Sequence, residues 1–138
     1  QGFQPAFSDR VFVLKIYPGL NPQLLHSIQL DNVGAVILEA FGTGNIPVKD
    51  KYSLIPFVER CRKQECHVLV TSQAAYDAVD LSLYQSGREL DNLGALSAGE
   101  MTMEATLTKT MNLLAMNLSE RDFSIRFCSS AAGEREAL

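Results

Sequence analysis

Two glycines and an asparagine follow an apolar run of the chain. Residues 33–38 read Val-Gly-Ala-Val-Ile-Leu, and the stretch 42–45 reads Gly-Thr-Gly-Asn. Glycine lets the backbone turn sharply and approach a small ligand, and the amide of Asn45 can donate to a carboxylate or accept from an ammonium group. The pattern therefore suits contact with a small zwitterion. A tight turn without any ligand explains the two glycines with fewer assumptions.

The glycine turn does not match the motifs that bind phosphate. A P-loop needs a lysine and then a serine or threonine after its last glycine, whereas Gly44 is followed by Asn45-Ile46-Pro47. The dinucleotide fingerprint would place a third glycine at position 47, where this chain has proline. We therefore predict no nucleotide and no other cofactor.

The chain offers no complete catalytic set. Thr71 and Ser72 end a strand-like run, but neither lies in a G-x-S-x-G elbow, and nothing around His26 or His67 indicates a base. The three cysteines lack CxxC spacing, and no histidine–carboxylate–thiol cluster is present. We predict no metal site and interpret the cysteines as free thiols in a reducing compartment.

The composition is that of a globular protein. The 138 residues favour one domain, with 46% hydrophobic and 20% charged residues. The net charge of −4 argues against a nucleic-acid partner, and no apolar run reaches the length of about 18 residues that indicates a membrane span. Because the chain begins with Gln1 rather than methionine, we expect a fragment or a processed product.

Strand-like and helix-like patterns alternate along the chain. Strands are predicted at Val11–Tyr17, Val33–Phe41, His67–Thr71 and Leu93–Leu96. Helices are predicted after a cap at Asn21, over Ser53–Gln64, after a cap at Thr102 and over Glu120–Cys128. Residues 72–92 are interpreted mostly as loop with at most one helical turn, and residues 129–138 as a frayed tail. On the helix after Thr102, the predicted core stripe is Met103, Leu107, Met111 and Leu114.

This alternation predicts parallel strands joined by helical crossovers. The expected fold class is α/β, a small three-layer α/β/α domain with a mainly parallel four-stranded sheet of flavodoxin-like shape. Sheets of this kind bind ligands at the carboxyl ends of their strands. The loops 18–21, 42–47 and 72–76 should therefore share one edge.

Five stretches of the chain resemble the C-terminal domain of cytosolic, type I L-asparaginases. They are Tyr17-Pro18-Gly19, Phe41-Gly42-Thr43-Gly44-Asn45-Ile46-Pro47, Thr71-Ser72-Gln73, Tyr84-Gln85-Ser86-Gly87 and Glu100–Lys109. Each motif is weak alone, but the five occur in order between about Val11 and Leu114 with plausible spacing.

The resemblance implies a role in L-asparagine hydrolysis without catalysis by this chain. Family members use threonines in T-G-G-T and G-T-D-T motifs of an N-terminal domain, and neither motif is present here. The implied partners are L-asparagine or a similar amino acid, the N-terminal catalytic domain, and further copies in a homodimer or homotetramer. The implied location is cytoplasmic. Asn45, with Thr43 and Gly44, matches the turn that completes the active site of a neighbouring subunit.

Some family members also carry a second asparagine site that activates the enzyme. The positions that match its pocket are Glu39, Ser72 and Gln73, with Ala74 where those proteins have cysteine. Glu39 replaces an arginine, which removes the natural partner of a ligand carboxylate. The sequence therefore indicates a possible effector pocket but argues against activation by asparagine.

Two other interpretations stay open. The chain could be a freestanding module that senses a small ligand, or a fragment of a tRNA-dependent amidotransferase subunit. The glycine–asparagine–proline turn fits asparaginase better than the amidotransferase, and the chain has no basic surface for tRNA.

Overall fold

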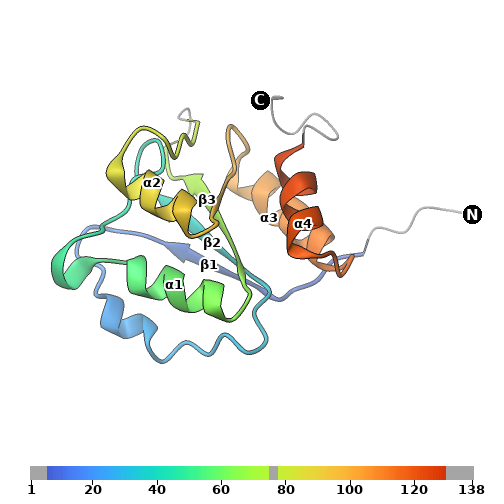
Figure 1. Ribbon diagram of the computed structural model, residues 1–138, viewed down its shortest axis with the longest axis horizontal. Coiled ribbons are helices and arrows are strands. Elements are labelled where there is room, and N and C mark those ends of the chain that lie inside the picture. Colours follow the sequence, from blue (N-terminus) through green and yellow to red (C-terminus); the bar gives the residue numbers. More distant parts are fainter. Residues whose placement is uncertain (1–5, 75–77, 130–138) are drawn as a thin grey trace, which may run out of the picture.

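A computed structural model describes residues 6–74 and 78–129 of the chain (Figure 1). The strands are β1 (Val11–Lys15), β2 (Ala35–Ala40), β3 (His67–Ser72) and β4 (Leu96–Ser97). The α-helices are α1 (Ile55–Lys63), α2 (Gln85–Asn92), α3 (Met103–Leu114) and α4 (Glu120–Cys128), and η1 (Pro22–Leu25) and η2 (Asp50–Tyr52) are short 3-10 helices.

The four strands form one parallel sheet in the order β1-β2-β3-β4. β2 lies inside the sheet and is buried along nearly its whole length, as its continuous hydrophobicity predicts. The predicted α/β class with a parallel four-stranded sheet is confirmed. The strands follow chain order, so the sheet lacks the reversal of strand order that creates the binding crevice of flavodoxin itself.

Helices cover both faces of the sheet, as Figure 1 shows. On one face Val36 and Leu38 of β2 share a core with Val58 of α1 and Leu90 of α2. On the other face Ile37 belongs to a second core, which α3 and α4 complete with Leu113, Leu114, Phe123 and Phe127. None of the helices within the described ranges has the length and hydrophobicity needed to span a bilayer.

Two sequence predictions between residues 72 and 97 are wrong. The segment predicted as loop contains the eight-residue helix α2, whose sequence QSGRELDN has no repeated large apolar residue and buries only Ser86, Gly87 and Leu90. The last strand was predicted at Leu93–Leu96 but covers Leu96–Ser97. Residues before β4 end helix α2 instead: Leu93 is its C-cap, and Gly94 adopts a φ of +91°.

The start of α3 is as predicted, but its buried face is not. Thr102 caps the helix, since its hydroxyl accepts from the Ala105 N–H at 3.0 Å. The most buried residues are Thr106, Thr110, Leu113 and Leu114, and only Leu114 belongs to the predicted stripe. Thr106 hides its hydroxyl by donating to the Thr102 carbonyl at 2.8 Å, a local bond that hydropathy patterns do not register.

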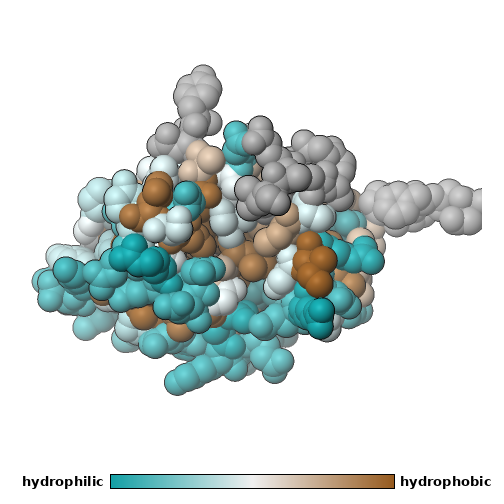
Figure 2. Space-filling view, turned by 45° about the horizontal axis from the view of Figure 1, so that its top comes forward, coloured by the Kyte–Doolittle hydropathy of each residue, from teal (hydrophilic) through white to brown (hydrophobic). Residues whose placement is uncertain are grey.

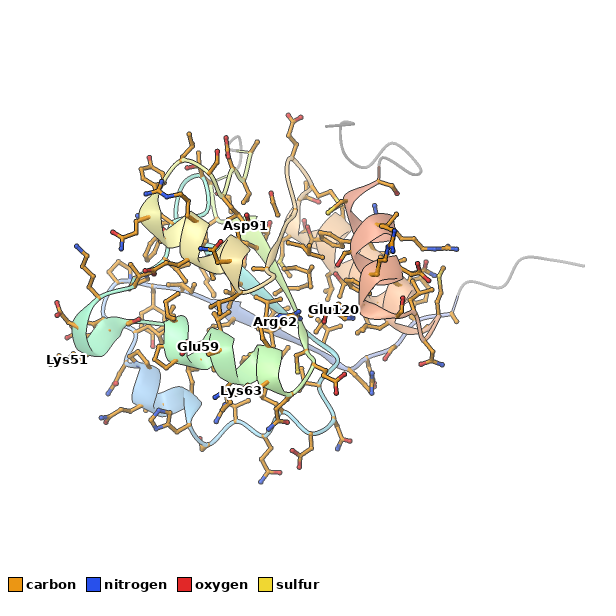
Figure 3. All side chains as sticks on the ribbon, viewed as in Figure 1. Lys51, Glu59, Arg62, Lys63, Asp91 and Glu120 are labelled. Carbon is orange, nitrogen blue, oxygen red and sulfur yellow. The ribbon has the colours of Figure 1, made fainter. Side chains whose placement is uncertain are left out.

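Arg62 joins four parts of the fold. From the last turn of α1 it donates through Nε to the Leu93 carbonyl at 2.8 Å and through Nη1 to the Cys66 carbonyl at 2.9 Å. Its Nη2 lies 2.7 Å from Glu120 Oε2 on α4, and Figure 3 shows this pair between the two helices. Because the Arg62 side chain is largely buried, these acceptors compensate for the loss of hydrating water.

We expect His67 to make the stability of the domain depend on pH. Its ring stacks on Phe123 with centroids 3.6 Å apart, and burial, aided by the Arg62 charge, lowers its pKa to about 4 although Glu120 acts in the opposite direction. The pKa of His67 is about 6.5 in the unfolded chain and about 4 in the folded chain. Between these two pH values the unfolded chain carries a proton on His67 and the folded chain does not. This contribution to stability should therefore be complete above pH 6.5 and decline toward pH 4, by at most about 1.4 kcal/mol per pH unit.

Urea titrations of His67→Phe and the unaltered chain between about pH 4 and 7 test this prediction. The variant keeps a stacked ring but does not titrate, so its free energy of unfolding should fall less steeply as the pH drops. Equal slopes in the two proteins would contradict it.

Candidate functional site

The glycine turn at the end of β2 is closed by its own backbone. The Phe41 N–H donates to the Asn45 carbonyl at 2.9 Å, and the Asn45 N–H donates back to the Phe41 carbonyl at 2.8 Å. Gly42 and Gly44 adopt φ values of +46° and +114°, which glycine tolerates best. A Cβ at Gly44 would also lie 3.0 Å from Val79 Cγ1. Both glycines are therefore explained by the turn itself.

Thr43 attaches this turn to the segment that precedes α2. Its carbonyl accepts from the Asp80 N–H at 2.9 Å, while its buried Oγ1 has no hydrogen-bond partner among the described residues. Asp80 in turn accepts from the Ser82 hydroxyl at 2.6 Å and the Ser82 N–H at 2.9 Å. These two bonds from Ser82 lower the pKa of Asp80.

Asn45 is exposed, yet its amide is anchored. Its Oδ1 accepts from the hydroxyl of Ser86 at 2.7 Å, and Ser86 is only 3% exposed. No interpretation of the sequence assigned a role to Ser86. The one available signal was its place within Tyr84-Gln85-Ser86-Gly87, a stretch that the polar composition of α2 made look like loop.

Gly87 brings Ser86 into reach of Asn45. A Cβ at Gly87 would lie 2.2 Å from the Leu81 carbonyl oxygen, so only glycine allows α2 to pack directly on the backbone of Leu81. In Figure 2 brown apolar patches lie among teal polar surface. Leu83 and Tyr84, in the loop before α2, are about half exposed.

Gly87→Ala should destabilise the chain by about 1–3 kcal/mol, because the added methyl group must displace α2 or the Leu81 backbone. Helix propensity alone predicts the opposite, a gain of up to about 1 kcal/mol for alanine. Urea denaturation measures the difference, and Gln85→Ala, at an exposed position of the same helix, serves as the control. A Gly87→Ala chain as stable as the unaltered one would contradict the close approach.

The three predicted effector residues lie in one cavity. Glu39, Ser72 and Gln73 line a space of about 260 Å³, together with Ala74 and residues 100–104 at the start of α3. Residues 75–76 of the predicted loop 72–76 lie outside the described residues. Glu100 and Glu104 are exposed and, with Glu39, make the lining acidic.

Ser72 and Gln73 are occupied by the backbone around them. The Ser72 hydroxyl donates to the Gly42 carbonyl and accepts from the Ala74 N–H at 2.9 Å. The Gln73 amide nitrogen donates to the carbonyls of Ile16 and Glu39, the latter at 2.8 Å. These side chains hold the carboxyl ends of β1 and β2 beside the turn after β3, and neither amide hydrogen of Gln73 is left for a ligand.

The residues considered as nucleophiles are not activated. Thr71 is 1% exposed, and the Ser72 hydroxyl is bonded to a carbonyl. His67 begins the strand that Ser72 ends, and the exposed His26 follows η1. Within the described part of the chain, no group of three or more histidine, cysteine or acidic side chains could hold a metal ion.

A protein-family comparison decides what this arrangement belongs to. The family model described as the glutaminase/asparaginase C-terminal domain matches residues 10–127. The chain belongs to this family. As a glutaminase/asparaginase C-terminal domain, it has the glycine turn, Asn45 and the acidic cavity at one edge of its sheet.

Individual relatives of the chain support the same family assignment. The L-asparaginase of Thermococcus kodakarensis is 38% identical over 109 residues, which are 79% of this chain and 32% of that protein. The solved structure of the thermostable L-asparaginase from Thermococcus kodakarensis matches with a TM-score of 0.87 and 32% identity, over 99% of this chain and 40% of the other. The structure of L-asparaginase I from Vibrio cholerae matches with a TM-score of 0.80 and 28% identity, over 92% of this chain and 38% of the other.

Another relative has a different name. A glutamyl-tRNA(Gln) amidotransferase subunit of Thermoplasma acidophilum is 36% identical over 112 residues, which are 81% of this chain and 26% of that protein. The domain thus spans about a quarter to two-fifths of these relatives. The predicted resemblance to the asparaginase C-terminal domain is confirmed.

Proposed function

We propose that this domain is the non-catalytic C-terminal part of an L-asparagine amidohydrolase, which converts L-asparagine and water to L-aspartate and ammonia. It contributes Asn45, with Thr43 and Gly44, to the substrate site of a neighbouring subunit. The observation that carries the proposal is the exposed Asn45 on a turn that backbone hydrogen bonds close, at the carboxyl edge of a parallel sheet. The named L-asparaginases among its relatives support this substrate.

The chemistry of bond cleavage is assigned to the N-terminal domain of the same protein. In the C-terminal domain, Thr71 is buried and the Ser72 hydroxyl donates to the Gly42 carbonyl, so neither hydroxyl is free to attack an amide. The half-exposed side chains of Tyr17, Leu83 and Tyr84 are available for contact with that domain or with another subunit. We propose a homodimer or homotetramer in the cytoplasm, as in the type I enzymes that the sequence resembles.

The cavity beside Glu39 is the candidate effector site. Its charged lining residues are the carboxylates Glu39, Glu100 and Glu104. The Ser72 hydroxyl and the Gln73 amide nitrogen already donate to backbone carbonyls. A ligand carboxylate would be repelled there. We therefore propose that L-asparagine does not activate the enzyme through this cavity.

A second candidate function is that of a glutamyl-tRNA(Gln) amidotransferase subunit, since several relatives carry that name. The net charge of −4 gives the domain no general attraction for tRNA. A freestanding ligand-binding module is the remaining alternative, and it predicts ligand binding without a partner domain.

Ammonia release from L-asparagine tests the proposal. This chain alone should give no rate above the buffer blank, whereas the same chain with its N-terminal domain should turn over. Hydrolysis by the chain alone would overturn the non-catalytic role. Absence of activity in both samples, with asparagine binding to the chain alone, would favour the freestanding module.

A further inference from the structure

We propose that Ser86 is a positioning residue, which orients the amide of Asn45 so that its N–H donors face the ligand. Asn45 would then recognise an oxygen of the substrate, such as its carboxylate, and not the substrate ammonium group. The inference rests on the proposed contact between Asn45 and substrate, and it adds which end of the zwitterion is recognised.

The orientation follows from the needs of a buried hydroxyl. Ser86 is 3% exposed, and its hydroxyl makes one hydrogen bond within the described residues, to Asn45. A buried O–H requires an acceptor, and in the amide of Asn45 only Oδ1 can accept. With the amide reversed, Nδ2 would donate to Ser86 and the hydroxyl hydrogen would lose its acceptor, which is costly in a buried site.

Both partners of this bond are held by the backbone. Asn45 is fixed by the two hydrogen bonds that it shares with Phe41, and Ser86 is fixed because α2 packs on Leu81 at Gly87. The amide is therefore set in place before any ligand arrives, which reduces the entropy lost on binding.

The group that remains free is a donor. Asn45 is exposed, and its Nδ2 has no hydrogen-bond partner among the described residues. Two N–H groups suit a carboxylate or carbonyl oxygen, whereas a ligand ammonium has only donors and needs an acceptor. The sequence left this choice open, and the Ser86 bond decides it.

A double-mutant cycle in the complete protein tests the inference. Ser86→Ala should lower kcat/KM for L-asparagine about 3- to 10-fold, the loss expected for one weakened hydrogen bond, and Ser86→Thr should restore most of it. In an Asn45→Ala background, Ser86→Ala should have no further effect. Thr110→Val is the control, because it removes a buried hydroxyl of α3 that has no partner among the described residues, and it should leave the kinetics unchanged.

An NMR readout separates failure of this inference from failure of the proposed function. In this chain alone, Ser86→Ala should shift the side-chain amide resonances of Asn45. Ser86→Ala reducing activity equally in both backgrounds, or leaving the Asn45 resonances in place, would overturn the positioning role while the substrate contact stood. Asn45→Ala without kinetic effect would overturn the substrate contact, and the role of Ser86 with it.

Discussion

Asn45→Asp in the complete protein should lower kcat/KM for L-asparagine by about 100-fold or more, and further than Asn45→Ala. Alanine removes a hydrogen bond to a charged ligand group, a loss of about 1.5–3 kcal/mol or roughly 10- to 100-fold. Aspartate can keep the bond from Ser86 but turns a negative oxygen toward the substrate carboxylate. The like charges then add repulsion to the lost bond.

Steady-state kinetics of the two variants measure this order. Asn92→Asp makes the same substitution at the exposed end of α2 and should change kcat/KM less than about 2-fold. An Asn45→Asp enzyme as active as Asn45→Ala, or more active, would mean that position 45 faces the substrate ammonium or no ligand at all.

Arg62→Met should reduce the free energy of unfolding by about 2–4 kcal/mol, since it leaves the partly buried carbonyls of Leu93 and Cys66 without their charged donor. Methionine retains much of the apolar stem, so the loss reports the hydrogen bonds more than the packing. Urea denaturation of the purified chain measures the change.

Two variants divide this effect into its parts. Glu120→Gln should cost less than about 1 kcal/mol, because the Glu120 side chain is mostly exposed and its ion pair is screened by water. Lys63→Met makes a similar change at the next, exposed position and should alter stability by about 0.5 kcal/mol or less. Equal losses for Arg62→Met and Lys63→Met would contradict the role of Arg62.

The central strands and the last helix could be predicted from the sequence because local patterns determine them. β2 is continuously apolar, and α4 begins and ends at the predicted residues, Glu120 and Cys128. The helix predicted after Asn21 exists as a 3-10 turn, with the Asn21 side chain accepting from the Gln23 N–H at 3.0 Å. Helix α2 was missed because residues outside the helix support it. Leu81 packs against Gly87, and Asn45 accepts a hydrogen bond from Ser86.

Only part of the candidate site could be predicted, because some of its contacts join residues that are far apart in the sequence. Asn45 is exposed on its turn, and Glu39, Ser72 and Gln73 line one cavity, whereas the ligand contacts of these residues stay predictions. The function of the Gln73 amide was not predictable, because its acceptors are the carbonyls at the ends of two other strands. The predicted tail lies outside the described residues from position 130 onward.

A crystal structure of the complete protein with bound L-aspartate is the decisive test of the contact between Asn45 and the ligand. We expect the Asn45 Nδ2 to lie within hydrogen-bond distance of a ligand oxygen, about 2.7–3.2 Å, with Oδ1 still bonded to Ser86. A ligand bound in the catalytic site of the N-terminal domain with Asn45 out of contact, or with Oδ1 turned toward the ligand ammonium, would contradict it.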